Sequence, residues 1–323
     1  MPASRPETAM FIASPKVVFL GSLNMDLLIQ VARAPREGET VQGHSIHYVP
    51  GGKGANQAVS CARQGACVSL VGCVGSDHHG VTLLAALVED RIAVDGVLID
   101  PGEPTGVAMV MVDDNGQNRI VCIAGANARL RIDEEKFARQ LTQAQFLVMQ
   151  FEVPMQQVLQ AAQIAHRVGC KVILNPSPMQ VLPDELWPLV DTLIVNETEA
   201  QALTGVAPDD RPGTAARAAQ HLRDRGIARV VVTLGKLGAV ATDASGSSYH
   251  PAPAVRAIDT TAAGDTFLGA VTAALAEGQG LTASVESGIR AATLCVQTMG
   301  AQPSIPDRAA VTRSPSPPPW ITL

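Results

Sequence analysis

Residues 171–199, KVILNPSPMQVLPDELWPLVDTLIVNETE, contain two short apolar runs, and each run ends at an asparagine. Uninterrupted runs of β-branched and other apolar residues are typical of strands that are covered on both faces, as in a parallel sheet. The runs of this kind are Val17–Leu20, Lys171–Leu174, Thr192–Val195 and Val230–Leu234. They predict the strands of one buried, mostly parallel sheet.

Helical segments alternate with these strands. Apolar residues recur in them at intervals of three and four, and a glycine follows each segment. The clearest segments are Ala55–Ala62, Val158–Ala165 and Phe267–Leu275. This alternation predicts a three-layer αβα sandwich with a mostly parallel central sheet.

Two stretches interrupt the alternation. Residues 39–49 have no helical period, and residues 106–123 contain two β-prone arms on either side of Asn115-Gly116. Asn-Gly between such arms is typical of a tight hairpin. We predict that the two stretches form a small β-sheet lid beside a binding site.

The composition restricts the class of protein. The chain has 323 residues, of which 46% are hydrophobic and 17% charged, enough to bury a large core. Its formal net charge of -6 argues against a nucleic-acid or membrane partner, because such partners require a basic surface. No apolar run is long enough to cross a bilayer, no signal peptide is evident, and the six cysteines are dispersed, so we expect a cytoplasmic protein. We expect a flexible leader over residues 1–15, one domain over 16–311 and a proline-rich tail over 312–323.

The sharpest chemical motif is DTTAAGDTF at residues 259–267, in which small residues precede a helix. Unshielded amides at a helix start form an anion site, so we expect the backbone of residues 262–265 to bind developing negative charge. Asp265 lies in the first turn, where the helix dipole favours its ionised form and leaves it able to accept a proton. The alternative interpretation is an ordinary acidic residue at the start of a helix.

Other motifs predict a ligand that carries hydroxyl and phosphate groups. GGKGANQ at residues 51–57 matches neither the P-loop nor the dinucleotide pattern; its glycines permit close approach of a ligand or form a hinge. Asn24 and Asp26 follow the first strand, in a loop that suits vicinal hydroxyls or forms an Asx turn. Asn196 and Glu199 follow another strand and could approach hydrated Mg²⁺ or form a capping box.

In their order along the chain, these motifs resemble those of the ribokinase-like (PfkB) carbohydrate kinase family. The resemblance extends over nearly all of residues 16–308. The motifs that carry it are GSLNMD at 21–26, GGKGANQA at 51–58, AGAN at 124–127, NETE at 196–199, TLGKLG at 233–238, DTTAAGDTF at 259–267 and GAQPS at 300–304.

The resemblance implies ATP-dependent phosphorylation of D-ribose to D-ribose 5-phosphate. Asp265 would be the general base, beside an anion hole formed by the amides of Ala262, Ala263, Gly264 and Asp265. The implied sugar ligands are Asn24, Asp26, Gly52, Lys53, Asn56, Glu152 and Asp265. The implied ATP contacts are Asn196, Thr233, Gly235, Lys236, Gly238 and Gly264.

The resemblance also implies metal ions and a second copy of the chain. Mg²⁺ would bind the phosphates, influenced by Asn196 and Glu199 through water. A monovalent cation, usually K⁺, would be held by Asp259, Thr261, Cys295, Thr298, Gly300 and Ser304. Homodimerisation through the lid sheets is the expectation for the family.

Two positions depart from the family pattern. Ile289 stands where Asn or His often lies near the adenine, so we expect an apolar contact there. Met25 is larger than usual at its position and could favour 2-deoxyribose. The alternatives are therefore a kinase of 2-deoxyribose or another pentose, and a non-catalytic sugar-sensing protein on a kinase scaffold. The intact Asp265, Gly264 and Asn196 argue against the sensor.

Overall fold

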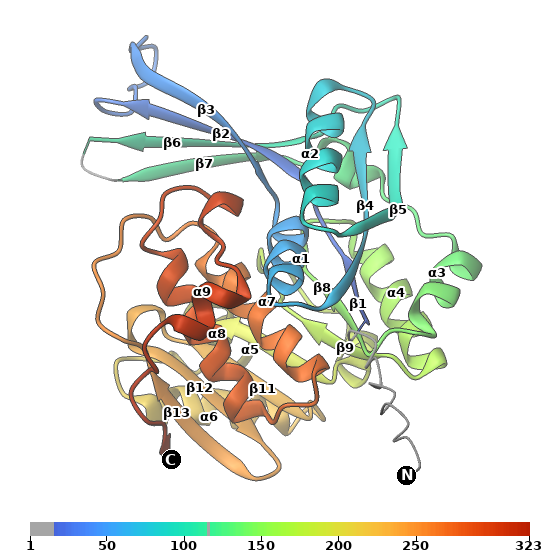
Figure 1. The fold of residues 1–323 in the computed structure, drawn as a ribbon, viewed down its shortest axis with the longest axis vertical. Helices are drawn as coiled ribbons and strands as arrows, with labels where there is room; N and C mark the ends of the chain where they lie inside the picture. The colour runs from blue at the N-terminus through green and yellow to red at the C-terminus, as the bar shows by residue number, and fades with distance from the viewer. Residues whose placement is uncertain (1–15, 115–116) are drawn as a thin grey trace, which may run out of the picture.

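The computed structural model describes residues 16–114 and 117–323, in which a large sheet lies between helices and a smaller sheet projects from one end (Figure 1). Within these residues, ten strands form the large sheet in the order β14-β13-β12-β11-β10-β9-β8-β1-β4-β5. In chain order the strands are β1 Lys16–Leu20, β4 Cys67–Gly75, β5 Ala93–Asp100, β8 Phe146–Met149, β9 Lys171–Leu174, β10 Thr192–Asn196, β11 Arg229–Thr233, β12 Gly238–Asp243, β13 Gly246–Pro251 and β14 Ile321–Thr322.

Pairing is parallel from β11 through β1 to β5, and antiparallel from β11 to β14. The four apolar runs of the sequence form β1, β9, β10 and β11, with Leu234 just beyond the last of them. Because consecutive side chains of a strand point to opposite faces, β1 contributes side chains to two cores. Val18 and Leu20 pack on one side of the sheet, and Val17 and Phe19 on the other.

Helices cover both sides of the large sheet, and their apolar residues complete the two cores. One layer contains α3 Glu134–Leu141, α4 Met155–Val168, α5 Glu197–Thr204 and α6 Pro212–Arg223. The other contains α1 Lys53–Arg63, α2 His78–Glu89, α7 Ala263–Ala276 and α8 Leu281–Cys295. The predicted three-layer αβα sandwich is confirmed. None of the described helices is long and apolar enough to cross a membrane.

The small sheet, which we call the lid, has the strand order β3-β2-β6-β7. Its strands are β2 Asn24–Val31, β3 Gly43–Gly51, β6 Gly106–Asp113 and β7 Asn118–Ile123. β6 and β7 pair antiparallel, as predicted for the hairpin arms, while the predicted turn at Asn115-Gly116 lies outside the described residues. β2 was not predicted: it pairs with β3 and β6, so the expectation of a loop at Asn24 and Asp26 is wrong.

The C-terminal segment differs from the predicted tail. α9 spans Arg308–Arg313, so the expected boundary between residues 311 and 312 falls inside a helix. Beyond it, the chain returns to the large sheet, where β14 pairs with β13 and the Trp320 ring stacks on His250 with centroids 6.2 Å apart. An edge strand of two residues has no local sequence signal, because its partner is distant in the chain. The expected leader, residues 1–15, lies outside the described residues.

Candidate active site

The start of α7 offers unpaired backbone amides. Ala262, just before the helix, has left-handed backbone dihedrals with φ 58°. The Ala263 amide donates to the Thr260 carbonyl at 3.2 Å, so this member of the expected anion hole is engaged. The amides of Ala262, Gly264 and Asp265 have no acceptor among the described residues. Apart from its chain neighbours and the backbone of its own helix, no described atom lies within 4 Å of the position that a Cβ on Gly264 would occupy, which leaves space for an anion at the helix start.

Asp265 lies on the first turn of α7 and is 9% exposed. Its Oδ1 accepts a hydrogen bond from Gln57 Nε2 at 2.9 Å, and its Oδ2 accepts one from Asn56 Nδ2 at 3.2 Å. Burial raises the pKa of Asp265, while the nearby Lys53 and the two amides oppose that rise. The carboxylate is therefore desolvated and oriented, as a proton acceptor in a catalytic site must be.

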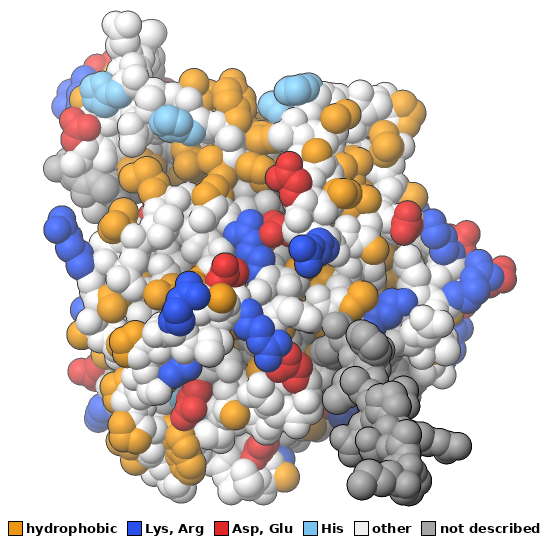
Figure 2. Space-filling model, viewed as in Figure 1, with side chains coloured by type: hydrophobic (Ala, Val, Ile, Leu, Met, Phe, Trp, Pro, Cys, Tyr) orange, Lys and Arg blue, Asp and Glu red, His pale blue; other side chains and the backbone are white. Residues whose placement is uncertain are grey.

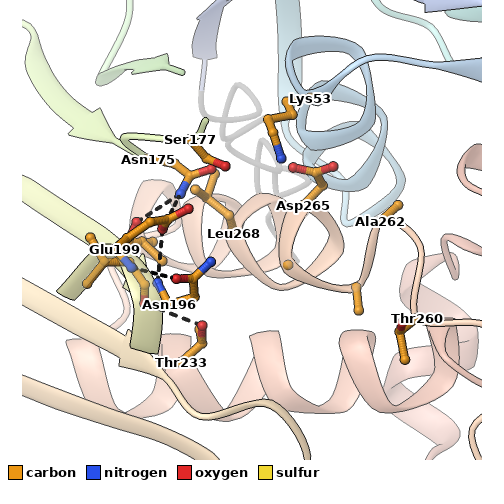
Figure 3. A pocket seen from close by; sticks show the side chains of 14 residues that line it. Lys53, Asn175, Ser177, Asn196, Glu199, Thr233, Thr260, Ala262, Asp265 and Leu268 are labelled. Atoms are coloured by element: carbon orange, nitrogen blue, oxygen red, sulfur yellow. Dashed lines mark hydrogen bonds between the residues drawn. The ribbon is translucent and has the colours of Figure 1, made fainter. Parts of the chain in front are cut away.

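Lys53 begins α1, and its side chain points toward the Asp265 carboxylate (Figure 3). Burial lowers the pKa of Lys53, but the carboxylates of Asp265, Glu152 and Glu199 outweigh burial and raise it above its usual value. The lysine is therefore held as a cation among three acidic groups.

A second polar group lies where the lid meets the large sheet. The Oδ1 of Asn24 accepts a hydrogen bond from Asn127 Nδ2 at 2.8 Å, and the amide of Lys53 donates to Glu152 Oε2 at 3.1 Å. Asp26 is 8% exposed, and burial, assisted by Glu152 and Asp265, raises its pKa to about 7. A cluster of carboxylates and amides of this kind can accept and donate hydrogen bonds to a polyol.

The glycines of the GGKG motif let the chain pack on itself. A Cβ on Gly51 would lie 2.2 Å from an Asp26 carboxylate oxygen, and one on Gly52, whose φ is +89°, would lie 2.7 Å from the Asn24 amide nitrogen. A Cβ on Gly54 would lie 2.6 Å from the carbonyl carbon of Gly21. These glycines therefore bring the start of α1 against residues 21–26 and assemble the polar group.

A polar cavity of about 240 Å³ lies between Asp265 and the end of β10. Figure 3 shows Lys53 and Asp265 on one side of it, with Asn175, Ser177, Glu199, Asn196 and Thr233 on the other. Asn196 and Glu199 form a complete capping box at the start of α5, as one of the two interpretations predicts, and they also line this cavity. Burial raises the pKa of Glu199.

A larger, mostly apolar cavity of about 460 Å³ adjoins the polar one, and Thr233, Thr260, Ala263 and Gly264 line both. Of the expected ATP contacts, Gly235, Lys236 and Gly238 line the larger cavity, whereas Asn196 lines the polar cavity alone. Ile289 is 3% exposed and contributes to the apolar wall. Other wall residues that the sequence analysis did not identify are Val255, Ala257, Phe267, Ala292 and Val296.

The residues expected to hold a monovalent cation gather behind the start of α7. Asp259 Oδ2 accepts from the Gly300 amide at 2.8 Å, and Asp259 Oδ1 accepts from the Thr261 hydroxyl at 2.7 Å. Cys295 Sγ lies 3.1 Å from the Ser304 hydroxyl oxygen and 3.7 Å from the Thr261 carbonyl oxygen. The exposed Thr298 reaches this group through its amide, which donates to the Cys295 carbonyl.

Side-chain acids, thiols and imidazoles are the usual protein ligands of multivalent metal ions. No group of three or more such side chains with metal-binding geometry occurs in residues 16–114 and 117–323.

Met25 does not face the polar group where the lid meets the large sheet. It alternates on β2 with Asn24 and Asp26, so its side chain lies on the opposite face of the lid, where it is 2% exposed in an apolar core. The expectation that Met25 shapes sugar preference is therefore wrong. Sequence reasoning also overlooked Gln57 and Asn175, although Gln57 directly follows Asn56 in the quoted motif and Asn175 ends the strand β9.

Comparison with known proteins gives consistent matches. A model of the pfkB family carbohydrate kinase matches residues 14–308. The chain is 42% identical over 290 residues to a ribokinase from Haemophilus influenzae, covering 90% of this chain and 94% of that protein. It is 39% identical over 310 residues to a ribokinase from Schizosaccharomyces pombe, with 92% and 97% covered.

A solved structure is also similar to this chain. The structure of Arabidopsis thaliana ribokinase complexed with ribose and ATP matches this one with a TM-score of 0.86 at 34% identity, covering 94% of this chain and 98% of that chain. The family predicted from the motifs is confirmed: the chain belongs to the pfkB family of carbohydrate kinases.

Proposed function

We propose that this chain transfers the γ-phosphoryl group of ATP to the 5-hydroxyl of D-ribose, with Asp265 as the general base. One observation carries the proposal. Asp265 stands between the polar group at the lid and the two adjoining cavities, beside unpaired amides at the start of α7. The ribokinases of Haemophilus influenzae and Schizosaccharomyces pombe give further support.

In the proposed reaction, the 5-hydroxyl proton moves to a carboxylate oxygen of Asp265. The hydroxyl oxygen bonds to the γ-phosphorus as the bond from that phosphorus to the bridging oxygen of ADP breaks, giving ribose 5-phosphate and ADP. The unpaired amides of Gly264 and Asp265 stabilise charge on the transferred group. Phosphoryl transfer depends mainly on positioning and charge stabilisation, both of which this arrangement supplies.

The sugar is proposed to bind to Asn24, Asp26, Gly52, Lys53, Asn56 and Glu152. The buried Oδ1 of Asn56 supports this assignment, because it has no hydrogen-bond partner in the described structure and a hydroxyl would satisfy it. Lid closure over the sugar would exclude water and so limit hydrolysis of ATP, with Gly51 and Gly52 as the hinge.

ATP is proposed to bind along the two cavities. Its base fits the apolar cavity lined by Ile289, and its phosphates fit the polar cavity that begins at Gly264. Thr233 lines both cavities, and Gly235, Lys236 and Gly238 line the apolar one. Mg²⁺, when bound to the phosphates, would neutralise their charge; Asn196 and Glu199 would hold its water ligands, which suits their oxygen donors.

A monovalent cation, K⁺, is proposed to bind at Asp259, Thr261, Cys295, Thr298, Gly300 and Ser304. Carboxylate, hydroxyl and carbonyl oxygens suit a hard cation, and Cys295 would contribute its carbonyl rather than its thiol. These residues tie the loop before α7 to the end of α8, so a cation there would organise the anion hole. Exchange of Na⁺ for K⁺ is expected to raise the activity; equal rates in both salts would exclude this role.

Homodimerisation through the lid and a cytoplasmic location are also proposed. Figure 2 shows hydrophobic side chains gathered at the end of the molecule that carries the lid, where Tyr48 is 58% exposed and Val121 60% exposed. The lid also ends in two edge strands, β3 and β7, which can pair with another copy. Sedimentation equilibrium tests the dimer, and a purely monomeric protein would exclude it. The location rests on the cysteine pattern.

The reaction is tested by coupling ADP formation to a spectrophotometric assay with ribose, 2-deoxyribose and other pentoses. The wild type is expected to prefer ribose, and Asp265→Asn to lose roughly three orders of magnitude in kcat with ATP affinity preserved. Near-normal kcat in Asp265→Asn would remove the base from the mechanism. A higher kcat/KM for 2-deoxyribose would replace the proposed substrate, and sugar binding without turnover by the wild type would indicate a sensor.

A further inference from the structure

A buried chain of side-chain amides connects α1 to the start of α7. Gln57 has no exposed surface, and its Nε2 donates to Asp265 Oδ1 at 2.9 Å and to Asn175 Oδ1 at 3.2 Å. Its Oε1 accepts a hydrogen bond from Nε2 of Gln150, which is also fully buried. Both amide hydrogens and the carbonyl oxygen of Gln57 therefore have partners, and these contacts fix the orientation of the amide.

Gln57 cannot itself contact a substrate, because its side chain lies wholly beneath the surface of the site. It reaches the site through two side chains. Asp265 is the proposed base, and Asn175 lines the polar cavity and donates from Nδ2 to the Ile194 carbonyl at 3.1 Å. The same Nδ2 lies 3.5 Å from Glu199 Oε2. The Gln57 amide thus connects Asp265, the proposed base, to the opposite wall of the polar cavity.

We propose that Gln57 is a positioning residue for phosphoryl transfer: its amide fixes the orientation of the Asp265 carboxylate relative to the Asn175 wall of the polar cavity. This inference rests on the proposed function, since it assigns Gln57 through the base. It adds a residue with no substrate contact to the machinery of the reaction. Gln57 donates to Oδ1 and Asn56 donates to Oδ2, so the two amides together fix the plane of the carboxylate.

The charged and titratable groups that face Asp265 determine how its pKa responds to the loss of Gln57. They are Lys53 on α1, Glu152 after β8, Asp26 on β2, Glu199 on α5 and Cys295 on α8. Lys53 favours the ionised form of Asp265, and the acidic groups oppose it. Without the Gln57 donor, the pKa of Asp265 rises further, so a larger fraction of the base is protonated at neutral pH. A purely structural role would lower stability and leave this titration unchanged.

The first test compares Gln57→Met with Gln64→Met in full-length protein, using the pH dependence of kcat/KM for ribose. Met retains most of the volume of Gln and removes both donors. For Gln57→Met we expect the acidic limb to move up by about one pH unit, kcat to fall about tenfold or more, and KM for ATP to change less than about twofold. Gln64 is the matched control: it lies about two helical turns beyond Gln57, is 8% exposed at the end of α1 and donates to the Pro306 carbonyl. Its acidic limb is expected to coincide with that of the wild type.

Gln57→Glu provides a second variant in case the methionine variant does not fold. Its carboxyl group retains an acceptor for Gln150 and adds an acidic group beside Asp265, so the acidic limb should again move to higher pH. If the wild type phosphorylates ribose and the folded Gln57 variants have the wild-type acidic limb, the positioning role is wrong and the proposed function stands. If the wild type itself does not phosphorylate ribose, the proposed function fails, whatever the variants do.

Discussion

Replacing Asp26 by Asn is expected to stabilise the free protein while it weakens sugar binding. The Asp26 carboxylate is 8% exposed and accepts no hydrogen bond from the described residues. Burial, together with Glu152 and Asp265, raises its pKa from 3.8 to about 7. A rise of about three pH units corresponds to about 4 kcal/mol of unfavourable free energy when the group is ionised in the folded state.

The pH dependence follows from that direction. Because the folded pKa lies above the unfolded one, the penalty is absent below pH 3.8, grows as the pH rises toward 7 and is complete above it. Asn carries no such penalty. Since relaxation and water entry reduce the full value, we expect Asp26→Asn to increase the free energy of unfolding by about 1–3 kcal/mol near pH 8.

Urea unfolding of both proteins at several pH values measures this difference. The gap in unfolding free energy should close as the pH falls toward 4, and KM for ribose should rise about tenfold or more, because the variant lacks a charged acceptor. A gap that does not change with pH, or an Asp26→Asn variant less stable than the wild type near pH 8, would refute the reasoning about burial.

Three other changes test separate features. Asp77→Asn should destabilise the protein by about 1 kcal/mol at neutral pH and by less in acid. The reason is that hydrogen bonds from two amides and a hydroxyl lower the pKa of Asp77, which caps α2. Urea unfolding that shows the same destabilisation at every pH would contradict this prediction. Gly269→Ala should lower Tm and kcat together, since its Cβ would lie 2.5 Å from the backbone of α1. Unchanged steady-state kinetics would show that the α1–α7 contact does not set the geometry of Asp265. Deleting residues 314–323 should lower the free energy of unfolding by about 1–2 kcal/mol and leave kcat unchanged, because it removes β14 and the stacking of Trp320 on His250. Calorimetry measures the change, and an unchanged Tm would show that this segment adds no stability.

Segments whose structure depends on near neighbours could be predicted. The runs that became β1, β9, β10 and β11 are continuously apolar, and the helices α1, α4 and α7 have apolar stripes. Both signals arise from side chains within a few residues of each other. β2 and β14 could not be predicted in this way, since each is held in its sheet by strands distant in the sequence.

The features of the candidate site also separate into those set by near neighbours and those set by distant segments. DTTAAGDTF predicts a helix start with exposed amides because the conformation of that turn is local, whereas the engaged amide of Ala263 depends on details of the turn itself. The opposite orientations of Met25 and Asp26 follow once β2 is known to be a strand. Gln57 appears in the quoted motif, but its contact with Asp265, 208 residues away, exists only after α1 packs on α7.

The sequence by itself therefore determined the chemistry that is available: a family, an acid at a helix start, glycines that permit close packing and a set of amides and carboxylates. Only the tertiary structure decided which of these groups share one site, which of them are desolvated, and which oxygen of Asp265 each amide binds. The physical reason is the distance along the chain over which each kind of interaction acts. Backbone propensity and amphipathic period act over a few residues, whereas desolvation and hydrogen-bond partners in the site depend on segments that meet only when the sheets and helices have packed.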